Sequence, residues 1–187
     1  MKKIIFFASG NGSNVENCIS HFINQGVAVE HLVFTNNKNA GVIERIEKFR
    51  LNATIFSKDD FKNGSVLKQI QNFNPDLIVL AGFLLLFPVE IINLFPNKII
   101  NIHPSLLPKF GGKGMYSMHV HNAVLAANEK ESGITIHYVT EHYDEGTYIA
   151  QFKTSLEKIT SPEELAKNIH HLEYEHFPKV IETLLNG

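Results

Sequence analysis

The stretch Lys2-Lys3-Ile4-Ile5-Phe6-Phe7-Ala8-Ser9-Gly10-Asn11-Gly12-Ser13-Asn14 decides the fold. The apolar run within it, Lys2–Ala8, is continuous, as expected for a strand that is buried on both faces of a parallel sheet. A glycine-containing turn leads from this strand into Asn14–Asn24, where apolar residues recur on one helical face. The stretch therefore predicts a strand, a tight turn and a helix in succession.

The same alternation of strands and helices continues along the chain. Further strands are expected at Glu30–Thr35, Ala53–Phe56, Asp76–Ala81 and Lys98–Ile102, and helices at Gly41–Phe49, Asp59–Phe73 (with Gly64 as a weak point), Val89–Phe95, His119–Ala127 and 162–185. Gly133–Tyr138 and Tyr148–Lys153 alternate apolar and polar residues, which is typical of antiparallel edge strands. The pattern predicts an α/β fold: a doubly wound, mostly parallel sheet with helices on both faces and antiparallel strands near the C-terminal edge. No linker or repeat interrupts it, so residues 1–187 are expected to form a single domain.

Composition narrows the class of protein. The chain has 187 residues, 44% of them hydrophobic, and a net charge of -2. This charge does not favour binding to nucleic acid or to a membrane surface, and no apolar run has the length of a transmembrane helix. The single cysteine, Cys18, excludes an internal disulfide. We therefore expect a soluble, reduced, cytoplasmic protein.

The turn Ser9–Asn14 resembles an anion site. Its glycines allow the backbone to approach a ligand closely, and the helix that follows presents free N–H groups and a positive dipole end. The turn is not a Walker A loop, and Val15 stands where a dinucleotide fingerprint requires glycine. A phosphate monoester is thus favoured over NAD or ATP, although an ordinary capped turn between a strand and a helix would have the same sequence.

An amide and an imidazole stand where the strand Lys98–Ile102 ends. Because Asn101 and His103 are two residues apart, they point to the same face, whereas Ile100 and Ile102 point to the core. In open parallel sheets, ligands bind at the carboxyl ends of the strands. An amide and an imidazole placed side by side there can stabilise and protonate a developing oxyanion, although a lone histidine is more often structural.

A carboxylate follows in the turn Asp144-Glu145-Gly146-Thr147, where Gly146 is expected to take a positive φ. A turn aspartate is often merely structural. If Asp144 instead lies near His103, it should raise the pKa of that imidazole above about 6.5 and could orient a proton-carrying water. The chain has ten histidines, but their spacing matches no known metal motif, so no metal is expected.

Taken together, these segments resemble the glycinamide ribonucleotide formyltransferases, which use 10-formyltetrahydrofolate in the third step of purine synthesis. The resemblance covers nearly the whole chain and rests on GNGSN (10–14), LAGF (80–83), NIHPSLLP (101–108), the pair His119 and His121, GITIHYVTEHYDEG (133–146), and Glu173 followed by Pro178.

The resemblance implies a role for each matching position. Asn101, His103 and Asp144 would be catalytic. The phosphate and ribose of the substrate would be bound by Gly10, Asn11, Gly12, Ser13, Asn14 and Glu173. The folate co-substrate, 10-formyltetrahydrofolate, would be bound by Phe83, Leu84, Leu85, Leu86, Glu141, His142 and Tyr143. Similar enzymes have an arginine where Leu85 stands, and the glycine-rich segment Gly111–Gly114 lies in a longer loop whose contacts cannot be carried over.

The resemblance implies transfer of the formyl group to the amine of 5'-phosphoribosylglycinamide without a covalent enzyme intermediate, by a monomer or a homodimer. Three alternatives remain. A 10-formyltetrahydrofolate hydrolase would carry an additional N-terminal domain, and a methionyl-tRNA formyltransferase would carry a basic C-terminal domain. A catalytically inactive nucleotide-binding homologue would lack a member of the trio Asn101, His103 and Asp144.

Overall fold

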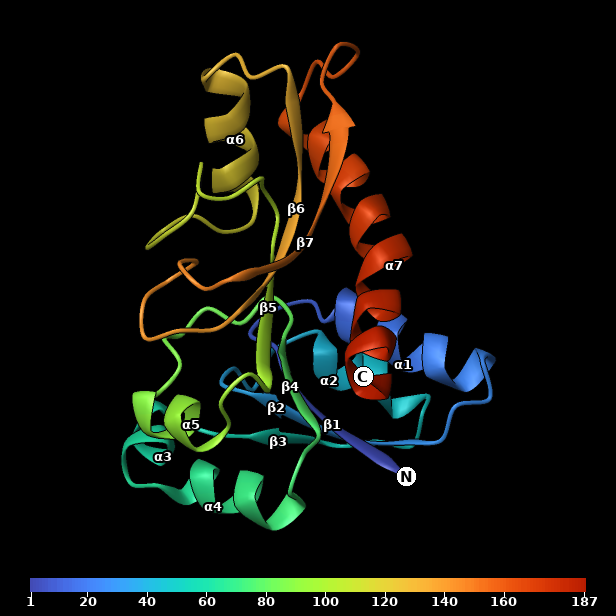
Figure 1. The fold of residues 1–187 in the computed structure, drawn as a ribbon, viewed down its shortest axis with the longest axis vertical. Coiled ribbons are helices and arrows are strands. Elements are labelled where there is room, and N and C mark those ends of the chain that lie inside the picture. The colour runs from blue at the N-terminus through green and yellow to red at the C-terminus, as the bar shows by residue number, and fades with distance from the viewer.

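A computed structural model describes residues 1–187 and contains a single seven-stranded sheet (Figure 1). The strands lie in the order β3-β2-β1-β4-β5-β6-β7. The pairs from β3 to β5 are parallel, and the pairs β5–β6 and β6–β7 are antiparallel. The strand bounds are β1 Lys2–Phe7, β2 Val29–Thr35, β3 Ala53–Ile55, β4 Leu77–Leu80, β5 Ile99–His103, β6 Glu131–Tyr138 and β7 Tyr148–Ser155. The predicted doubly wound sheet with an antiparallel edge is thus confirmed.

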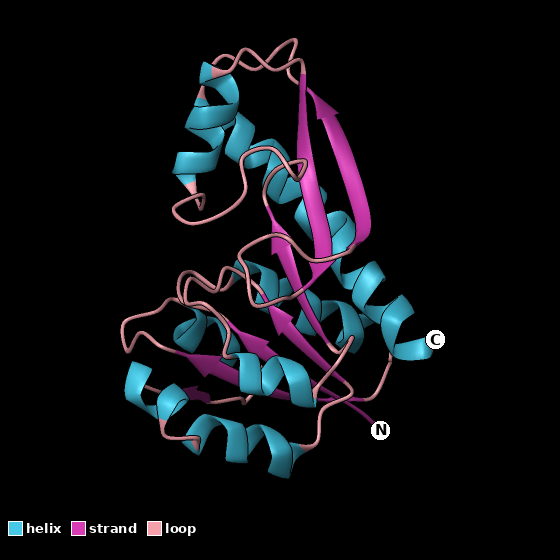
Figure 2. Ribbon diagram, turned by 60° about the vertical axis from the view of Figure 1, so that its left-hand side comes forward, coloured by secondary structure: helices cyan, strands magenta, loops and turns pink.

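Helices cover both faces of this sheet (Figure 2). Their bounds are α1 Ser13–Asn24, α2 Val42–Glu47, α3 Lys58–Lys62, α4 Ser65–Phe73, α5 Val89–Leu94, α6 Met118–Ala126 and α7 Pro162–Asn186. Helices α1, α2, α6 and α7 share one apolar core with alternate residues of the strands, whereas α4 and α5 pack in a second core on the other face. Because both faces are covered, β4 and the last four residues of β1, Ile4–Phe7, are apolar and buried throughout. None of the helices has the length and hydropathy needed to cross a membrane.

The predicted helix Asp59–Phe73 is wrong in one respect, because the chain forms two helices there. Gly64 has a φ of +80° and separates α3 from α4. The side chain of Ser57 caps α3 by accepting a hydrogen bond from the N–H of Asp60. The Asp60 carboxylate in turn accepts a hydrogen bond from the N–H of Ser57. The capped turn and the left-handed glycine stabilise a break that apolar periodicity alone does not reveal.

The strand order reverses between β1 and β4. From β1 the chain moves outward through β2 to β3, and it then returns to β4 on the other side of β1. In open α/β sheets the crevice outside the carboxyl ends of the strands at such a point receives the ligand. The loops that follow β1, β4 and β5 meet at this crevice.

Candidate active site

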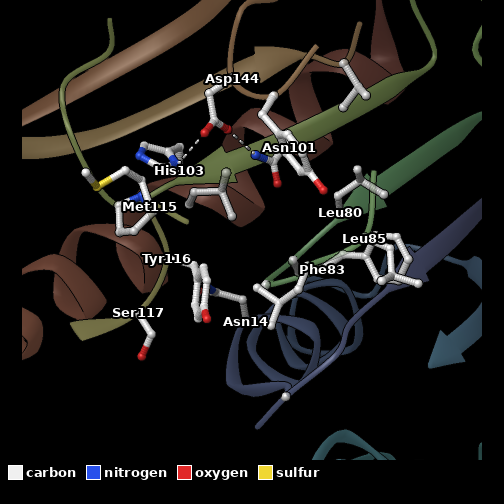
Figure 3. A pocket seen from close by; sticks show the side chains of 18 of the residues that line it. Asn14, Leu80, Phe83, Leu85, Asn101, His103, Met115, Tyr116, Ser117 and Asp144 are labelled. Atoms are coloured by element: carbon white, nitrogen blue, oxygen red, sulfur yellow. Dashed lines mark hydrogen bonds and ion pairs between the residues drawn. The ribbon is translucent and has the colours of Figure 1, made fainter. Parts of the chain in front are cut away.

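A cavity of about 800 Å³ opens at the carboxyl ends of β1, β4 and β5 (Figure 3). Its wall includes the segments Gly10–Asn14, Leu80–Phe87 and Asn101–Pro104, together with Asp144 and Glu173. Every predicted site residue lines this cavity except Glu141, which is exposed and does not reach the wall. The geometry therefore brings the predicted anion loop, the predicted catalytic trio and the predicted folate wall into one site.

The trio Asn101, His103 and Asp144 converges in this cavity (Figure 3). The Asp144 carboxylate lies between the other two: its Oδ2 is 3.4 Å from His103 Nδ1, and its Oδ1 is 3.5 Å from Asn101 Nδ2. Nε2 of His103 lies 2.8 Å from the Phe110 carbonyl oxygen, to which it donates when protonated there. Both imidazole nitrogens thus face acceptors, an arrangement that suits a ring carrying two protons.

The turn that holds Asp144 differs from the prediction in one detail. The positive φ, +59°, falls on Asp144 itself and not on Gly146. Glycine is required at position 146 for another reason, because a Cβ there would lie 1.6 Å from the carbonyl oxygen of Tyr138. The backbone of the turn crosses the end of β6 at this point, which aims Asp144 into the cavity.

The predicted rise in the pKa of His103 is wrong in its net direction. Burial, with a smaller effect of the charge of His137, lowers this pKa more than the charge of Asp144 and the bond to Phe110 raise it. Burial also opposes the ionisation of Asp144, but its contact with His137, the charge of His103 and the N–H of Gly112 outweigh it and lower the pKa of Asp144. Asp144 is therefore a carboxylate near neutral pH, whereas His103 takes its second proton most readily when a ligand adds negative charge beside it.

His137 is a site residue that the sequence reasoning missed. It lies opposite Asn101 in the antiparallel pairing of β5 with β6 and is almost completely buried. Its Nδ1 lies 2.9 Å from the carbonyl oxygen of Tyr138, and its Nε2 is 3.1 Å from Asn101 Nδ2 and 3.6 Å from Asp144 Oδ1. With the proton on Nδ1, Nε2 accepts from Asn101 and fixes the orientation of that amide. The alternation of β6 was the available signal, because it places His137 on the same face as Thr135.

The loop between β1 and α1 has the geometry of an anion cradle. Gly12 is the N-cap of α1 with a φ of +76°, and a Cβ at this position would lie 2.4 Å from Cβ of Val42. Asn14 on the first turn donates from Nδ2 to Oε2 of Glu173, at 2.9 Å, while its own Oδ1 is buried without a partner. The helix N–H groups at the start of α1 therefore lie at the cavity beside a buried carboxyl group.

Glu173 titrates far above the usual range. Burial raises its pKa to about 7, against the opposing effect of the hydrogen bond from Asn14. Between the ordinary value of 4.5 and about 7, the folded protein keeps a proton that the unfolded chain releases. The free energy of unfolding therefore falls as the pH rises through this window.

We expect Glu173→Gln to remove this pH dependence. Above pH 7 the variant should be more stable than the wild type by on the order of 2–3 kcal/mol, because it carries no buried charge, and the difference should vanish near pH 4.5. Urea unfolding at several pH values measures it, with Glu175→Gln, at a more exposed position of the same helix, as the matched control. A stability difference that stays constant between pH 5 and pH 8 would contradict the assignment.

The predicted folate wall follows β4 and is fixed to the anion loop. The hydroxyl of Ser9 accepts from the N–H of Leu84 at 3.0 Å and donates to Oδ1 of Asn36 at 2.7 Å. Phe83 packs edge-on against Phe7, with 5.3 Å between the ring centroids, within a cluster of phenylalanines beneath the wall. Leu84 and its neighbours are therefore presented to the cavity on a rigid support.

The cavity also contains residues to which the sequence analysis gave no role. The segment Gly112–Ser117 forms one side, and the N–H of Gly112 donates to Oδ2 of Asp144 at 2.8 Å. His121 and His170 line the wall as well. Burial, with smaller effects of His170 and His103, lowers the pKa of His121 to about 4, so this imidazole is neutral, and its Nδ1 is buried without a partner. No group of three or more histidine, cysteine or acidic side chains is arranged to hold a metal ion.

Comparison with known proteins places this chain in one family. Residues 2–181 match the family model described as formyl transferase, and the chain belongs to this family. Its relatives include a chloroplastic phosphoribosylglycinamide formyltransferase of Arabidopsis thaliana, 38% identical over 98% of the chain, and the phosphoribosylglycinamide formyltransferase of Bacillus subtilis, 35% identical over 99% of the chain. The chain spans 65% of the plant relative's length and 95% of the bacterial one's.

A solved structure gives the same result. The crystal structure of phosphoribosylglycinamide formyltransferase from Bacillus halodurans superposes with a TM-score of 0.87 at 31% identity, covering 98% of this chain and 95% of that one. The predicted formyltransferase fold is thereby confirmed.

Proposed function

We propose that the chain transfers the formyl group of 10-formyltetrahydrofolate to the amine of 5'-phosphoribosylglycinamide, giving 5'-phosphoribosyl-N-formylglycinamide and tetrahydrofolate. The observation that carries the proposal is the convergence of Asn101, His103 and Asp144 in a cavity that also contains the loop Gly10–Asn14. Such a cavity suits one phosphorylated amine and one flat acyl donor bound side by side. A bacterial relative that is named for this activity, and 95% of whose length the chain covers, supports the proposal.

In the proposed complex, each substrate takes one part of the cavity. The N–H groups at the start of α1 bind the phosphate, and Glu173 with Asn14 binds the ribose hydroxyls. The apolar segment Phe83–Leu86, with His142 and Tyr143 across the cavity, holds the ring system of the folate. Glu141 lies outside this wall and has no part in the proposal.

The reaction begins when the glycinamide amine attacks the formyl carbon, which is bonded to N10 of the folate. A C–N bond forms, and the carbonyl electron pair moves to oxygen. Asn101 donates a hydrogen bond to this oxyanion, and the positive charge of protonated His103, whose two N–H groups point to Asp144 and Phe110, stabilises it electrostatically. In acyl-transfer enzymes one such donor contributes about 10²- to 10³-fold in rate. One N–H of Asn101 is directed to His137 at 3.1 Å, while its contact with Asp144 is long at 3.5 Å, which leaves a donor for the oxyanion.

Asp144 moves the proton in this scheme. Its carboxylate accepts the proton of the attacking nitrogen through a water, and the proton is delivered to N10 as the bond from carbon to N10 breaks. Its negative charge also favours the imidazolium form of His103 against burial, and the growing oxyanion adds to that effect. The carboxylate therefore acts both as a proton carrier and as a counter-charge.

Incubation of the protein with 10-formyltetrahydrofolate, with and without the ribonucleotide, tests the proposal. Tetrahydrofolate should appear only when both substrates are present. Release without the amine would identify a hydrolase instead, and binding of both ligands without release would identify an inactive homologue. The cytoplasmic location and the choice between monomer and homodimer stay predictions.

A further inference from the structure

The walls of the cavity are poor in positive charge, although the proposed ribonucleotide brings a phosphate dianion. The only ionisable acids in the wall are Asp144 and Glu173, and the only lysine or arginine is Lys113. Three of the five imidazoles in the wall, those of His103, His121 and His170, are poor substitutes for a lysine in the free protein, because burial lowers their pKa. A dianion that enters this cavity beside the Asp144 carboxylate is therefore stabilised by a positive partner.

The basic side chains near the anion loop are already engaged. Arg45 donates from Nε to Oδ1 of Asn11 and pairs with Glu16, and Lys48 pairs with the same glutamate. None of these three charged side chains lines the cavity. The loop therefore offers backbone N–H groups to a phosphate without a free cation of its own.

Lys113 is available for this task. The ion pairs of the chain engage six other lysines but not Lys113. It stands between Gly112 and Gly114, which both have a φ of +91° and open space where a Cβ would be. The N–H of Gly112 holds this segment to Asp144 at 2.8 Å. The segment then continues along the same cavity that Asn14 lines, and Figure 3 shows Tyr116 and Asn14 both projecting into it.

We propose that Lys113 is the cation that binds the phosphate group of the ribonucleotide, together with the backbone of the loop Gly10–Asn14. The inference rests on the proposed function for the identity of the substrate. It assigns a ligand to the glycine-rich loop, whose two left-handed glycines leave the lysine free to turn toward the anion.

Equilibrium binding tests the inference without any need for turnover. Ribose 5-phosphate and glycinamide ribonucleotide are titrated calorimetrically into the wild type, Lys113→Ala and Lys113→Arg. We expect Lys113→Ala to weaken binding of both ligands about five- to tenfold, because a charge-assisted contact to phosphate is lost, while Lys113→Arg retains most of it. Raising the salt concentration should weaken binding to the wild type more than to Lys113→Ala.

Lys109 provides the matched control. It belongs to the same loop but lines a separate, smaller hollow and pairs with Glu129 at 2.8 Å. Lys109→Ala should leave binding of ribose 5-phosphate unchanged. Tetrahydrofolate binding, measured in parallel, should stay within twofold in Lys113→Ala, since its carboxylates are the other anions that could meet this lysine.

Two results would overturn the inference. Equal affinities of the wild type and Lys113→Ala for ribose 5-phosphate would show that the lysine does not touch the phosphate. Weakening of tetrahydrofolate alone would assign the lysine to the folate carboxylates instead. If the wild type binds neither ribose 5-phosphate nor the ribonucleotide, the proposed function itself is wrong and the inference is wrong with it; normal binding without a Lys113 effect overturns the inference alone.

Discussion

Asp144→Asn is expected to lower kcat by about 10²- to 10³-fold, because it removes the proton acceptor of the reaction. The same change removes the charge that raises the pKa of His103 against burial. The asparagine is nearly isosteric and can still accept from the N–H of Gly112, so the loop over the cavity should keep its position. Binding of the phosphorylated substrate, which involves other residues, should remain nearly intact. Steady-state kinetics combined with calorimetric binding separates the two effects.

The matched control for this variant is Glu145→Gln. This neighbouring carboxylate is exposed and does not line the cavity. Its replacement by glutamine changes the net charge of the turn by the same amount as Asp144→Asn does. It should alter kcat by less than about twofold, as is usual for surface substitutions away from a site. Near-normal turnover in Asp144→Asn, or an equal loss in both variants, would remove Asp144 from the mechanism.

The pH profile gives an independent signature of the pair Asp144 and His103. Burial lowers the pKa of His103, and Asp144 partly opposes that effect. Without the carboxylate, the pKa of His103 should fall further, so its protonated form needs a lower pH. The residual activity of Asp144→Asn should therefore have its alkaline limit at a lower pH than the wild type, which the pH dependence of kcat/KM measures.

Much of the fold could be predicted because the strands of a covered parallel sheet leave a strong pattern. Continuous apolar runs such as those of β1 and β4 indicate burial on both faces, and the alternation of β7 indicates the antiparallel edge. The alternating sequence of β6 also suggested an edge strand, but β6 lies between β5 and β7 and is buried on both faces. The break at Gly64 was harder to predict. A glycine within a periodic segment is compatible with one weakened helix or with two, and the Ser57 cap decides between them only through contacts distant from the glycine.

The site could be predicted to the extent that its residues lie at strand ends or within a motif. Asn101 and His103 share a face through their spacing alone. His137 was missed although it lies within the stretch 133–146, because its position opposite Asn101 depends on the register between β5 and β6. The pKa of His103 was predicted in the wrong direction for a similar reason: the sequence indicates a nearby carboxylate but not the depth of burial, and here burial dominates.

Gly12→Ala is the second change with a large expected effect. The residue has a φ of +76°, and a Cβ there would lie 2.4 to 2.6 Å from the Cβ, Cγ2 and Cα atoms of Val42. A left-handed conformation costs a non-glycine residue about 1–2 kcal/mol, and the backbone contact with α2 cannot be relieved by rotating a side chain. The loop must therefore shift, and with it the N–H groups at the start of α1 that are proposed to bind the phosphate.

We expect the KM for the ribonucleotide to rise about 10- to 100-fold in Gly12→Ala, since several charge-assisted hydrogen bonds depend on this geometry. The KM for the folate should rise less, because the wall Phe83–Leu86 is anchored through Ser9, before the displaced residue. Gly10→Ala is the matched comparison: its Cβ would meet no atom within 4 Å, so its effect should be several-fold smaller. Equal rises in the two KM values, or equal effects of the two glycine variants, would show that the loop does not bind the phosphate through the backbone geometry that Gly12 permits.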